Sequence, residues 1–176
     1  HLDLHLSIRR QRQMCIRDRN IPQDQMPVTE PLVGELLITY SFDLPNMFQM
    51  VTGADLSRLG IAPDEIRQLA VDNLKRQLPD LGLSDEPPVK QIVTGGNLEA
   101  CALLATSFWD GVASETEGEL VAVAPSRDVL LFCSSQSAEG LETLRGFAKQ
   151  VLEEESTHGL SDQLMCWRGS KWELYP

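Results

Sequence analysis

The segment Gly118–Ser135, GELVAVAPSRDVLLFCSS, constrains the fold more than any other part of the sequence. Two apolar runs, Leu120–Ala124 and Val129–Cys133, flank the polar tetrad Pro125–Asp128. Short apolar runs on either side of a turn are typical of a buried β-hairpin. We therefore predict that this hairpin lies in the middle of a sheet and that the other elements pack around it.

Three further segments have the pattern of strands. Glu35–Phe42 places Leu36, Ile38, Tyr40 and Phe42 on one face, which predicts a half-buried strand. Val89–Thr94 is predicted as a second strand. Near the end of the chain, the runs Gln163–Trp167 and Lys171–Tyr175 flank a short polar turn, which predicts a closing hairpin. Trp167 and Trp172 are then expected to pair across that hairpin, and an exposed aromatic patch is the alternative.

Four helices are predicted from their caps and periodicity. Thr52 caps a short helix that ends near Gly60, and Pro63 begins a longer one. Asn97 caps a helix from Leu98 to about Trp109, and Ser137 caps the fourth helix. The second helix has an apolar stripe expected to face the core, made of Ile66, Leu69, Ala70, Leu74 and Leu78. Between the second helix and the next strand, Pro79–Pro88 is predicted to be a loop.

The order of these elements mixes adjacent hairpins with crossovers through helices. We therefore predict an α+β fold, with a mostly antiparallel mixed sheet of about six strands and three to four helices packed mainly on one face. The single domain is expected to span residues 32–176, after a proline-containing linker at residues 20–31. Residues 1–19 are expected to be non-native or disordered, because Arg10–Arg19, RQRQMCIRDR, resembles translated sequencing-adapter sequence. A basic arm for nucleic acid is the alternative for this segment.

The charge of the chain argues against two classes of partner. Its formal net charge is −11, although the segment His1–Arg19 is basic. An acidic body repels nucleic-acid phosphates and anionic lipid surfaces, so we expect neither nucleic acid nor a membrane as a partner. No apolar run approaches the roughly 20 residues that span a bilayer, and no secretory signal is recognisable. The four cysteines are far apart, and Cys101, Cys133 and Cys166 have apolar neighbours, so we interpret them as free thiols in a cytoplasmic protein.

Two turns carry the candidate binding residues. Gly95, Gly96 and Asn97 follow a strand and precede a helix, where backbone N–H groups can hold an anion. This turn lacks the spacing of the known nucleotide-binding motifs, and a tight turn with an ordinary cap explains it as well. In the central hairpin, Arg127 and Asp128 can bind a carboxylate or phosphate, or simply close a solvated turn.

Glu99 lies one turn into the predicted helix and meets Arg127 if that helix packs beside the hairpin; such a pair is as readily structural as functional. The sequence contains no recognisable catalytic constellation, and no Cys/His cluster for a metal. We assign no catalytic residue, no metal and no cofactor.

Four stretches resemble the YtpQ-like family of bacterial proteins, which are classed as a domain of unknown function. They read GELLITYSF from Gly34, TGGNLEA from Thr94, GELVAVAPSRDVLLF from Gly118 and WRGSKWELY from Trp167. With the helices between them, the resemblance covers about residues 28–176. It implies one intracellular bacterial domain and supplies no activity and no site residues.

The sequence therefore favours a non-catalytic binding or regulatory module that binds a protein partner or a small anionic ligand. The first alternative is a small-anion or phosphate-ligand binding protein or enzyme, which uses the Gly95–Asn97 turn together with Arg127. The second alternative is a structural or oligomer-forming protein that uses Trp167 and Trp172. Which of these holds depends on whether the two turns lie at the same end of the sheet.

Overall fold

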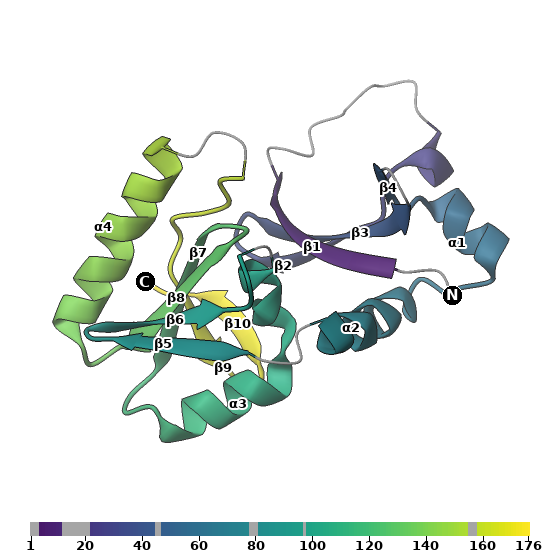
Figure 1. The fold of residues 1–176 in the computed structure, drawn as a ribbon. Helices are drawn as coiled ribbons and strands as arrows, with labels where there is room; N and C mark the ends of the chain where they lie inside the picture. The colour runs from purple at the N-terminus through teal and green to yellow at the C-terminus, as the bar shows by residue number, and fades with distance from the viewer. Residues whose placement is uncertain (1–3, 12–21, 45–46, 78–80, 97, 155–157) are drawn as a thin grey trace.

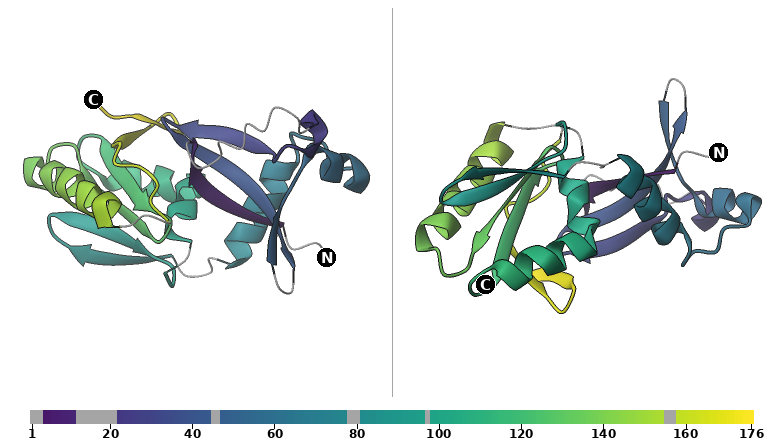
Figure 2. Two further views of the ribbon diagram at one scale, coloured as in Figure 1. Left: turned by 90° about the horizontal axis from the view of Figure 1, so that it is seen from above. Right: turned by 60° about the horizontal axis from the view of Figure 1, so that its bottom comes forward.

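Two antiparallel sheets and several helices form the structure (Figure 1). It is a computed structural model that describes residues 4–11, 22–44, 47–77, 81–96, 98–154 and 158–176. The sheets lie side by side, with the longest helix on the far side of the six-stranded sheet (Figure 2). These features confirm the predicted α+β class with its largely antiparallel pairing.

The six-stranded sheet contains the predicted central hairpin. Its order is β10-β9-β7-β8-β6-β5, so the hairpin strands β7 and β8 are the two middle strands, as predicted. The closing hairpin, β9 and β10, pairs Trp167 directly with Trp172. In chain order the six strands are β5 (Gly82–Glu86), β6 (Val89–Val93), β7 (Leu120–Ser126), β8 (Val129–Ser134), β9 (Met165–Arg168) and β10 (Lys171–Leu174).

Strand β7 is buried along its whole length, and its side chains alternate between two apolar cores. Leu120, Ala122 and Ala124 belong to the larger core, which also contains Trp109. Val121 and Val123 belong to a smaller core beneath the helix α4 (Ala138–Glu154). Helices therefore cover both faces of this sheet, whereas the sequence led us to expect them mainly on one.

The four-stranded sheet is built around a long strand, β3 (Leu36–Leu44), which pairs with β1 (Leu4–Arg10), β2 (Thr29–Val33) and β4 (Met47–Met50). Alternation along β3 is as predicted: its four apolar side chains on one face are at most 4% exposed, namely Leu36, Ile38, Tyr40 and Phe42. On its other face Thr39 and Ser41 are buried too, and the hydroxyl oxygen of Thr39 lies 2.8 Å from that of Ser7 on β1.

The segment that we set aside as non-native or disordered contributes β1. Leu4, Leu6 and Ile8 alternate with more polar residues, and all three are at most 5% exposed in the larger core. The expected linker also contributes structure, because its last residues, from Thr29, belong to β2. A non-native origin for residues 1–19 stays a prediction.

Two helices lie beside the four-stranded sheet; the first follows its predicted cap, whereas the second begins at Ile66 and not at the predicted Pro63. Thr52 caps α1 (Gly53–Leu59) through a capping box with Asp55, and Gly60 ends the helix with a left-handed backbone. In α2 (Ile66–Gln77) three of the stripe residues, Ile66, Ala70 and Leu74, are buried. Leu69 is 45% exposed, so its assignment to the core is wrong, and Leu78 lies outside the described residues.

The predicted loop Pro79–Pro88 is wrong over Gly82–Glu86, which forms the edge strand β5. This strand pairs with β6 on one side only. The sequence GLSDE lacks the apolar alternation that predicts a strand. An edge strand can form without that alternation, because it is paired on one side only.

The predicted helix Leu98–Trp109 is replaced by two shorter elements. The six-residue 3-10 helix η3 (Glu99–Leu104) ends at Ala105, and α3 (Thr106–Glu115) continues beyond the predicted end. The indole N–H groups of Trp109 and Trp172 donate to the carbonyls of Ala102 and Leu103, at 2.6 and 2.9 Å. The Ala102 carbonyl also accepts the backbone N–H of Ala105 at 3.0 Å, a three-residue bond of the 3-10 type that closes η3.

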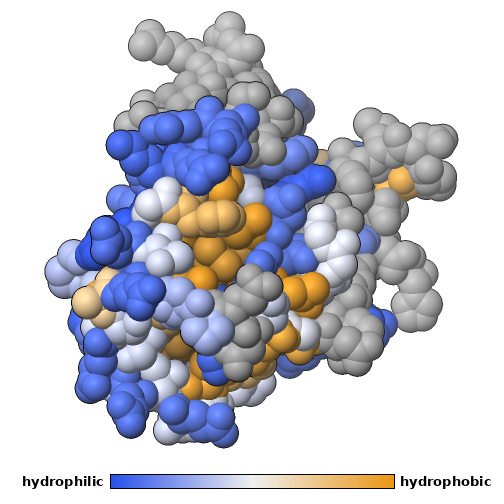
Figure 3. Space-filling model, turned by 60° about the vertical axis from the view of Figure 1, so that its left-hand side comes forward, coloured by the Kyte–Doolittle hydropathy of each residue, from blue (hydrophilic) through white to orange (hydrophobic). Residues whose placement is uncertain are grey.

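The surface of the described residues is mixed. Seen from the side of α4, it is largely hydrophilic with an apolar area in the middle (Figure 3). Large apolar side chains that are exposed are Leu69, Leu83, Val93, Phe147 and Leu174. No described helix is long and apolar enough to span a membrane.

The indole bond of Trp109 gives a test of this packing. Trp109→Phe removes the donor to the Ala102 carbonyl in a fully buried site, so we expect the free energy of unfolding to fall by about 2 kcal/mol. Urea denaturation measures the loss. Phe108→Leu, on the neighbouring half-buried ring, is the control for ring packing alone and should cost less; equal losses would contradict the role of the hydrogen bond.

Candidate functional site

The two candidate turns lie at the same end of the six-stranded sheet. The backbone N–H of Ala100 donates to the carbonyl of Arg127 at 3.0 Å, which joins η3 to the tip of the central hairpin. On the other side of the tip, the N–H of Arg127 donates to the carbonyl of His158 at 3.3 Å. The tip is therefore held by backbone bonds from two segments that are distant in the sequence.

Glu99 occupies the anion-binding position that the sequence suggested for a ligand. Its side chain is buried, at 2% exposure, and one carboxylate oxygen accepts the N–H groups of Thr94 and Gly96 at 3.0 and 2.7 Å. The other oxygen accepts the N–H of Leu98 at 3.0 Å. A buried carboxylate needs such donors, and three backbone N–H groups satisfy it. The turn is thus filled by a side chain of its own chain.

The two glycines of this turn are required by the backbone conformation. Gly95 and Gly96 have φ angles of 103° and 86°, a region that favours glycine. A Cβ atom at either position would meet nothing within 4 Å, so no close approach of neighbouring atoms explains them. Nearby, the buried Thr94 hydroxyl oxygen has no hydrogen-bond partner among the described residues. Asn97, the third predicted residue of the turn, lies outside the described residues.

Arg127 and Asp128 present their side chains to solvent at the hairpin tip. Asp128 accepts a hydrogen bond from the buried hydroxyl of Ser126 at 2.5 Å, so it helps to close the turn. The predicted approach of Glu99 to Arg127 occurs through the backbone: among the ion pairs of the described residues, none joins these two side chains. We call the exposed group Gly95, Gly96, Arg127 and Asp128 the tip surface.

The described thiols are protonated structural groups. Cys101, Cys133 and Cys166 are free and buried. Burial raises the pKa of Cys101 to about 12, with Glu99 adding to the rise and Arg127 opposing it. Burial likewise raises the pKa of Cys133 to about 11, and it raises that of Cys166. A thiol is nucleophilic only as the thiolate, so these positions do not have the environment of an activated nucleophile. Within the described ranges, no three His, Cys, Asp or Glu residues are grouped to hold a metal ion.

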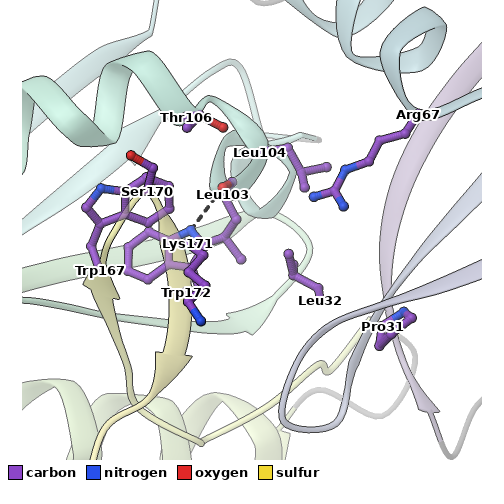
Figure 4. Close-up of a pocket in the computed structure, with 10 residues that line it drawn as sticks. All are labelled: Pro31, Leu32, Arg67, Leu103, Leu104, Thr106, Trp167, Ser170, Lys171 and Trp172. Carbon is purple, nitrogen blue, oxygen red and sulfur yellow. Dashed lines mark hydrogen bonds between the residues drawn. The ribbon is translucent and has the colours of Figure 1, made fainter. Parts of the chain in front are cut away.

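A cleft of about 190 Å³ lies away from the tip, between the two sheets (Figure 4). It is open between β2 on one side and the β9–β10 hairpin on the other, with η3 at its back and α2 above. We call it the tryptophan cleft, and its lining residues are Pro31, Leu32, Arg67, Leu103, Leu104, Thr106, Trp167, Ser170, Lys171 and Trp172.

Sequence reasoning missed the tryptophan cleft, although it predicted the pairing of Trp167 with Trp172. Both rings are largely buried, at 8% and 6% exposure, and their centroids are 4.9 Å apart. The paired arrangement is therefore correct, and the exposed aromatic patch is wrong. Only the residues from β2, α2 and η3 complete the cleft, and no local pattern places these beside the closing hairpin.

Comparison with known proteins identifies relatives but no activity. The UPF0354 protein of Listeria innocua is 27% identical over 127 residues, which is 66% of this chain and 45% of that protein. The UPF0354 protein of Staphylococcus haemolyticus is 23% identical over 132 residues, 72% of this chain and 45% of its own. That of Halalkalibacterium halodurans is 28% identical over 121 residues, 63% of this chain and 43% of its own.

This chain is similar to uncharacterised bacterial proteins and spans less than half the length of these relatives. No family model matches it. No solved structure matches it either.

The role of Glu99 is tested by Glu99→Gln. An amide keeps one oxygen acceptor and turns an N–H₂ group toward a backbone donor, so we expect the free energy of unfolding to fall by about 2 kcal/mol or more. Denaturation by urea is the measurement. Asp128→Asn removes a carboxylate at the exposed tip and should cost about 1 kcal/mol or less. Equal small losses in both variants would show that the three backbone bonds contribute little.

Thiol labelling tests the environment of the cysteines. In a Cys15→Ser variant, which leaves the three described cysteines, labelling by a disulfide reagent at pH 8 should be at least about 100-fold slower than in urea. A pKa of about 12 leaves only about one thiol in 10⁴ ionised at pH 8. Labelling should stay slower than in urea up to about pH 10, because the pKa values of Cys101 and Cys133 both lie above this pH. One rapidly labelled cysteine in the native protein would contradict this.

Proposed function

We propose that this chain is a non-catalytic binding module whose partner contacts the tip surface. The observation that carries this proposal is the 3.0 Å hydrogen bond from Ala100 to the carbonyl of Arg127. It fixes the Gly95–Gly96 turn and the charged hairpin tip at one end of the sheet, where both are exposed. We also infer that the domain is YtpQ-like and cytoplasmic; the quoted stretches support the first inference, and the free thiols support the second.

A binding role fits the site better than a reaction does, because the candidate reactive groups already have structural partners. The carboxylate of Glu99 accepts three backbone N–H groups, and that of Asp128 accepts the Ser126 hydroxyl. A general base must reach the proton of the substrate, and the burial of Glu99 prevents this. Arg127 differs from these residues because only its backbone atoms make the bonds that hold the tip.

The chemistry of the tip surface favours a protein partner that places a carboxylate on Arg127. A guanidinium pairs with a carboxylate through two parallel hydrogen bonds, which gives orientation as well as affinity. The alternative, a small anion cradled by the glycine turn, is less favoured because Glu99 already takes the N–H groups of Thr94, Gly96 and Leu98. The acidic character of the whole chain, with net charge −11, disfavours nucleic acid and anionic membranes.

Charge reversal at the tip tests the proposal. Arg127→Glu keeps both backbone hydrogen bonds of residue 127 but repels an acidic partner group, so the variant should fold normally and lose its partner. Wild type, Arg127→Glu and Arg145→Glu are used as baits in bacterial lysate, and the captured proteins are quantified by mass spectrometry. Arg145 is exposed on α4 and serves as the matched control.

We expect proteins that are enriched by wild type and Arg145→Glu and reduced at least about tenfold with Arg127→Glu. Identical sets for all three baits would contradict a role of the tip surface.

The small-anion alternative is tested in parallel by thermal shift with millimolar phosphate and dicarboxylates. A stabilisation that disappears in Arg127→Ala would favour that alternative over the protein partner.

A further inference from the structure

We propose that the tryptophan cleft is a binding site for a small carboxylate with one aromatic ring. This site is separate from the tip surface, because none of the four tip residues lines the cleft. The inference rests on the size of the cleft, on its charged residues and on the way its tryptophans are held.

The volume and the walls select a single ring. The cleft measures about 190 Å³, and a cavity of about 150 Å³ is known to accommodate benzene. Leu103 and Leu104 form its back, while Pro31 and Leu32 face the closing hairpin across the opening (Figure 4). Six of the ten lining residues are apolar or aromatic, and the volume is close to that of a single ring, so a ligand of this size fits best.

The charge of the cleft is opposite to that of the protein. The chain has 26 acidic and 15 basic residues, yet the charged residues that line the cleft are Arg67 and Lys171, both cations. Their acidic partners, Glu30 and Glu173, lie outside the lining. Arg67 is paired with Glu30 at 3.5 Å and Lys171 with Glu173 at 2.8 Å, so an anionic ligand competes with these carboxylates for the two cations.

Arg67 is free to turn toward a ligand at little cost. Its guanidinium is 3.5 Å from Glu30, and its side chain is 48% exposed. A long, exposed ion pair of this kind contributes little to stability, so exchanging it for a ligand carboxylate is nearly neutral before the new bonds form. In Figure 4 the Arg67 side chain extends from α2 toward Leu104, which lies at the back of the cleft.

The tryptophan rings that line the cleft are largely buried, and their indole N–H groups already have acceptors. Trp172 donates its indole N–H to the Leu103 carbonyl at 2.9 Å, and Trp167 donates to a carboxylate oxygen of Asp110 at 3.0 Å. Ring centroids of Trp109 and Trp172 are 5.1 Å apart in an edge-to-face arrangement, which fixes the wall before a ligand arrives. Polar recognition is therefore left to the two cations, which select an anionic group over an amide.

Indole resonances of the ¹⁵N-labelled full chain provide the test. The protein contains three tryptophans, and each peak is assigned with a Trp→Phe variant. Phenylacetate, phenylacetamide and phenyl phosphate are each added to about 20 mM, a range that suits a ligand of this size. We expect phenylacetate to shift the Trp167 and Trp172 peaks in a saturable manner, with the amide at least about tenfold weaker.

Variants at the cleft separate its charge from its shape. Arg67→Gln and Lys171→Gln should each weaken phenylacetate binding by about tenfold, whereas Lys149→Gln, an exposed lysine on α4, should not change it. Leu32→Trp fills the opening, keeps both cations and should abolish binding. Circular dichroism verifies that each variant is folded, and the remaining variants carry the test if one is not.

Three results would overturn the inference. They are indole peaks that do not move with phenylacetate, equal affinity for the amide and the carboxylate, and unchanged affinity in both Gln variants. Tighter binding of phenyl phosphate than of phenylacetate would replace the carboxylate by a phosphate ester as the ligand class and overturn the assignment made here. None of these results bears on the tip surface, which the Arg127 baits test independently.

Discussion

Burial of the strand β7 on both faces is the constraint on which the rest of the structure depends. Every residue of Leu120–Ser126 is buried, so the strand requires an apolar cover on each side of the sheet. On one side α4 supplies it, with Leu144 and Ala148 in the smaller core. On the other side the cover comes from η3 and α3 together with the four-stranded sheet, in one larger core. The position of η3, and so of both candidate sites, follows from this second cover.

The same packing explains why the glycine turn is filled from within. Once η3 lies against the sheet, Glu99 at its first position is buried and its carboxylate must be satisfied. The nearest donors are the backbone N–H groups of the turn that precedes it. Their bonds to Glu99 hold the turn in shape and leave its outer side exposed. A rigid turn beside a charged tip is suited to surface recognition, because little conformational freedom is lost on binding.

Local patterns were sufficient for the elements whose partners are close in the sequence. The apolar runs of β7 and β8, the Thr52 cap and the Trp167–Trp172 pair all depend on neighbours in the chain or across one hairpin, and the structure confirms each of them. Distant partners account for the failures. The helix predicted over Leu98–Trp109 is interrupted where the Leu103 carbonyl accepts the indole of Trp172, which lies 69 positions away in the sequence. No periodicity within η3 signals that bond.

Prediction of the candidate sites divides in the same way. Glycine and charged turn residues have local sequence patterns, so each of the two turns is predictable by itself. Whether the two turns lie together depends on the tertiary structure. Their contact depends on Ala100 and Arg127, which belong to different segments of the chain. The tryptophan cleft has no local signature of its own, because four separate parts of the chain line it. Its cations also belong to different elements, so charge patterning along the sequence does not bring them together.

The interruption of the helix at Ala105 links the fold to the tryptophan cleft. At this point the Ala102 carbonyl accepts both the backbone N–H of Ala105 and the indole N–H of Trp109, and the Leu103 carbonyl accepts the indole N–H of Trp172. With the interruption, the indole bonds direct the N–H groups of Trp109 and Trp172 at η3. The edge of Trp172 is thereby fixed, and its largely buried ring holds the closing hairpin against η3 beside the cleft. The position of this side of the cleft therefore depends on how the tryptophans satisfy their own polar atoms.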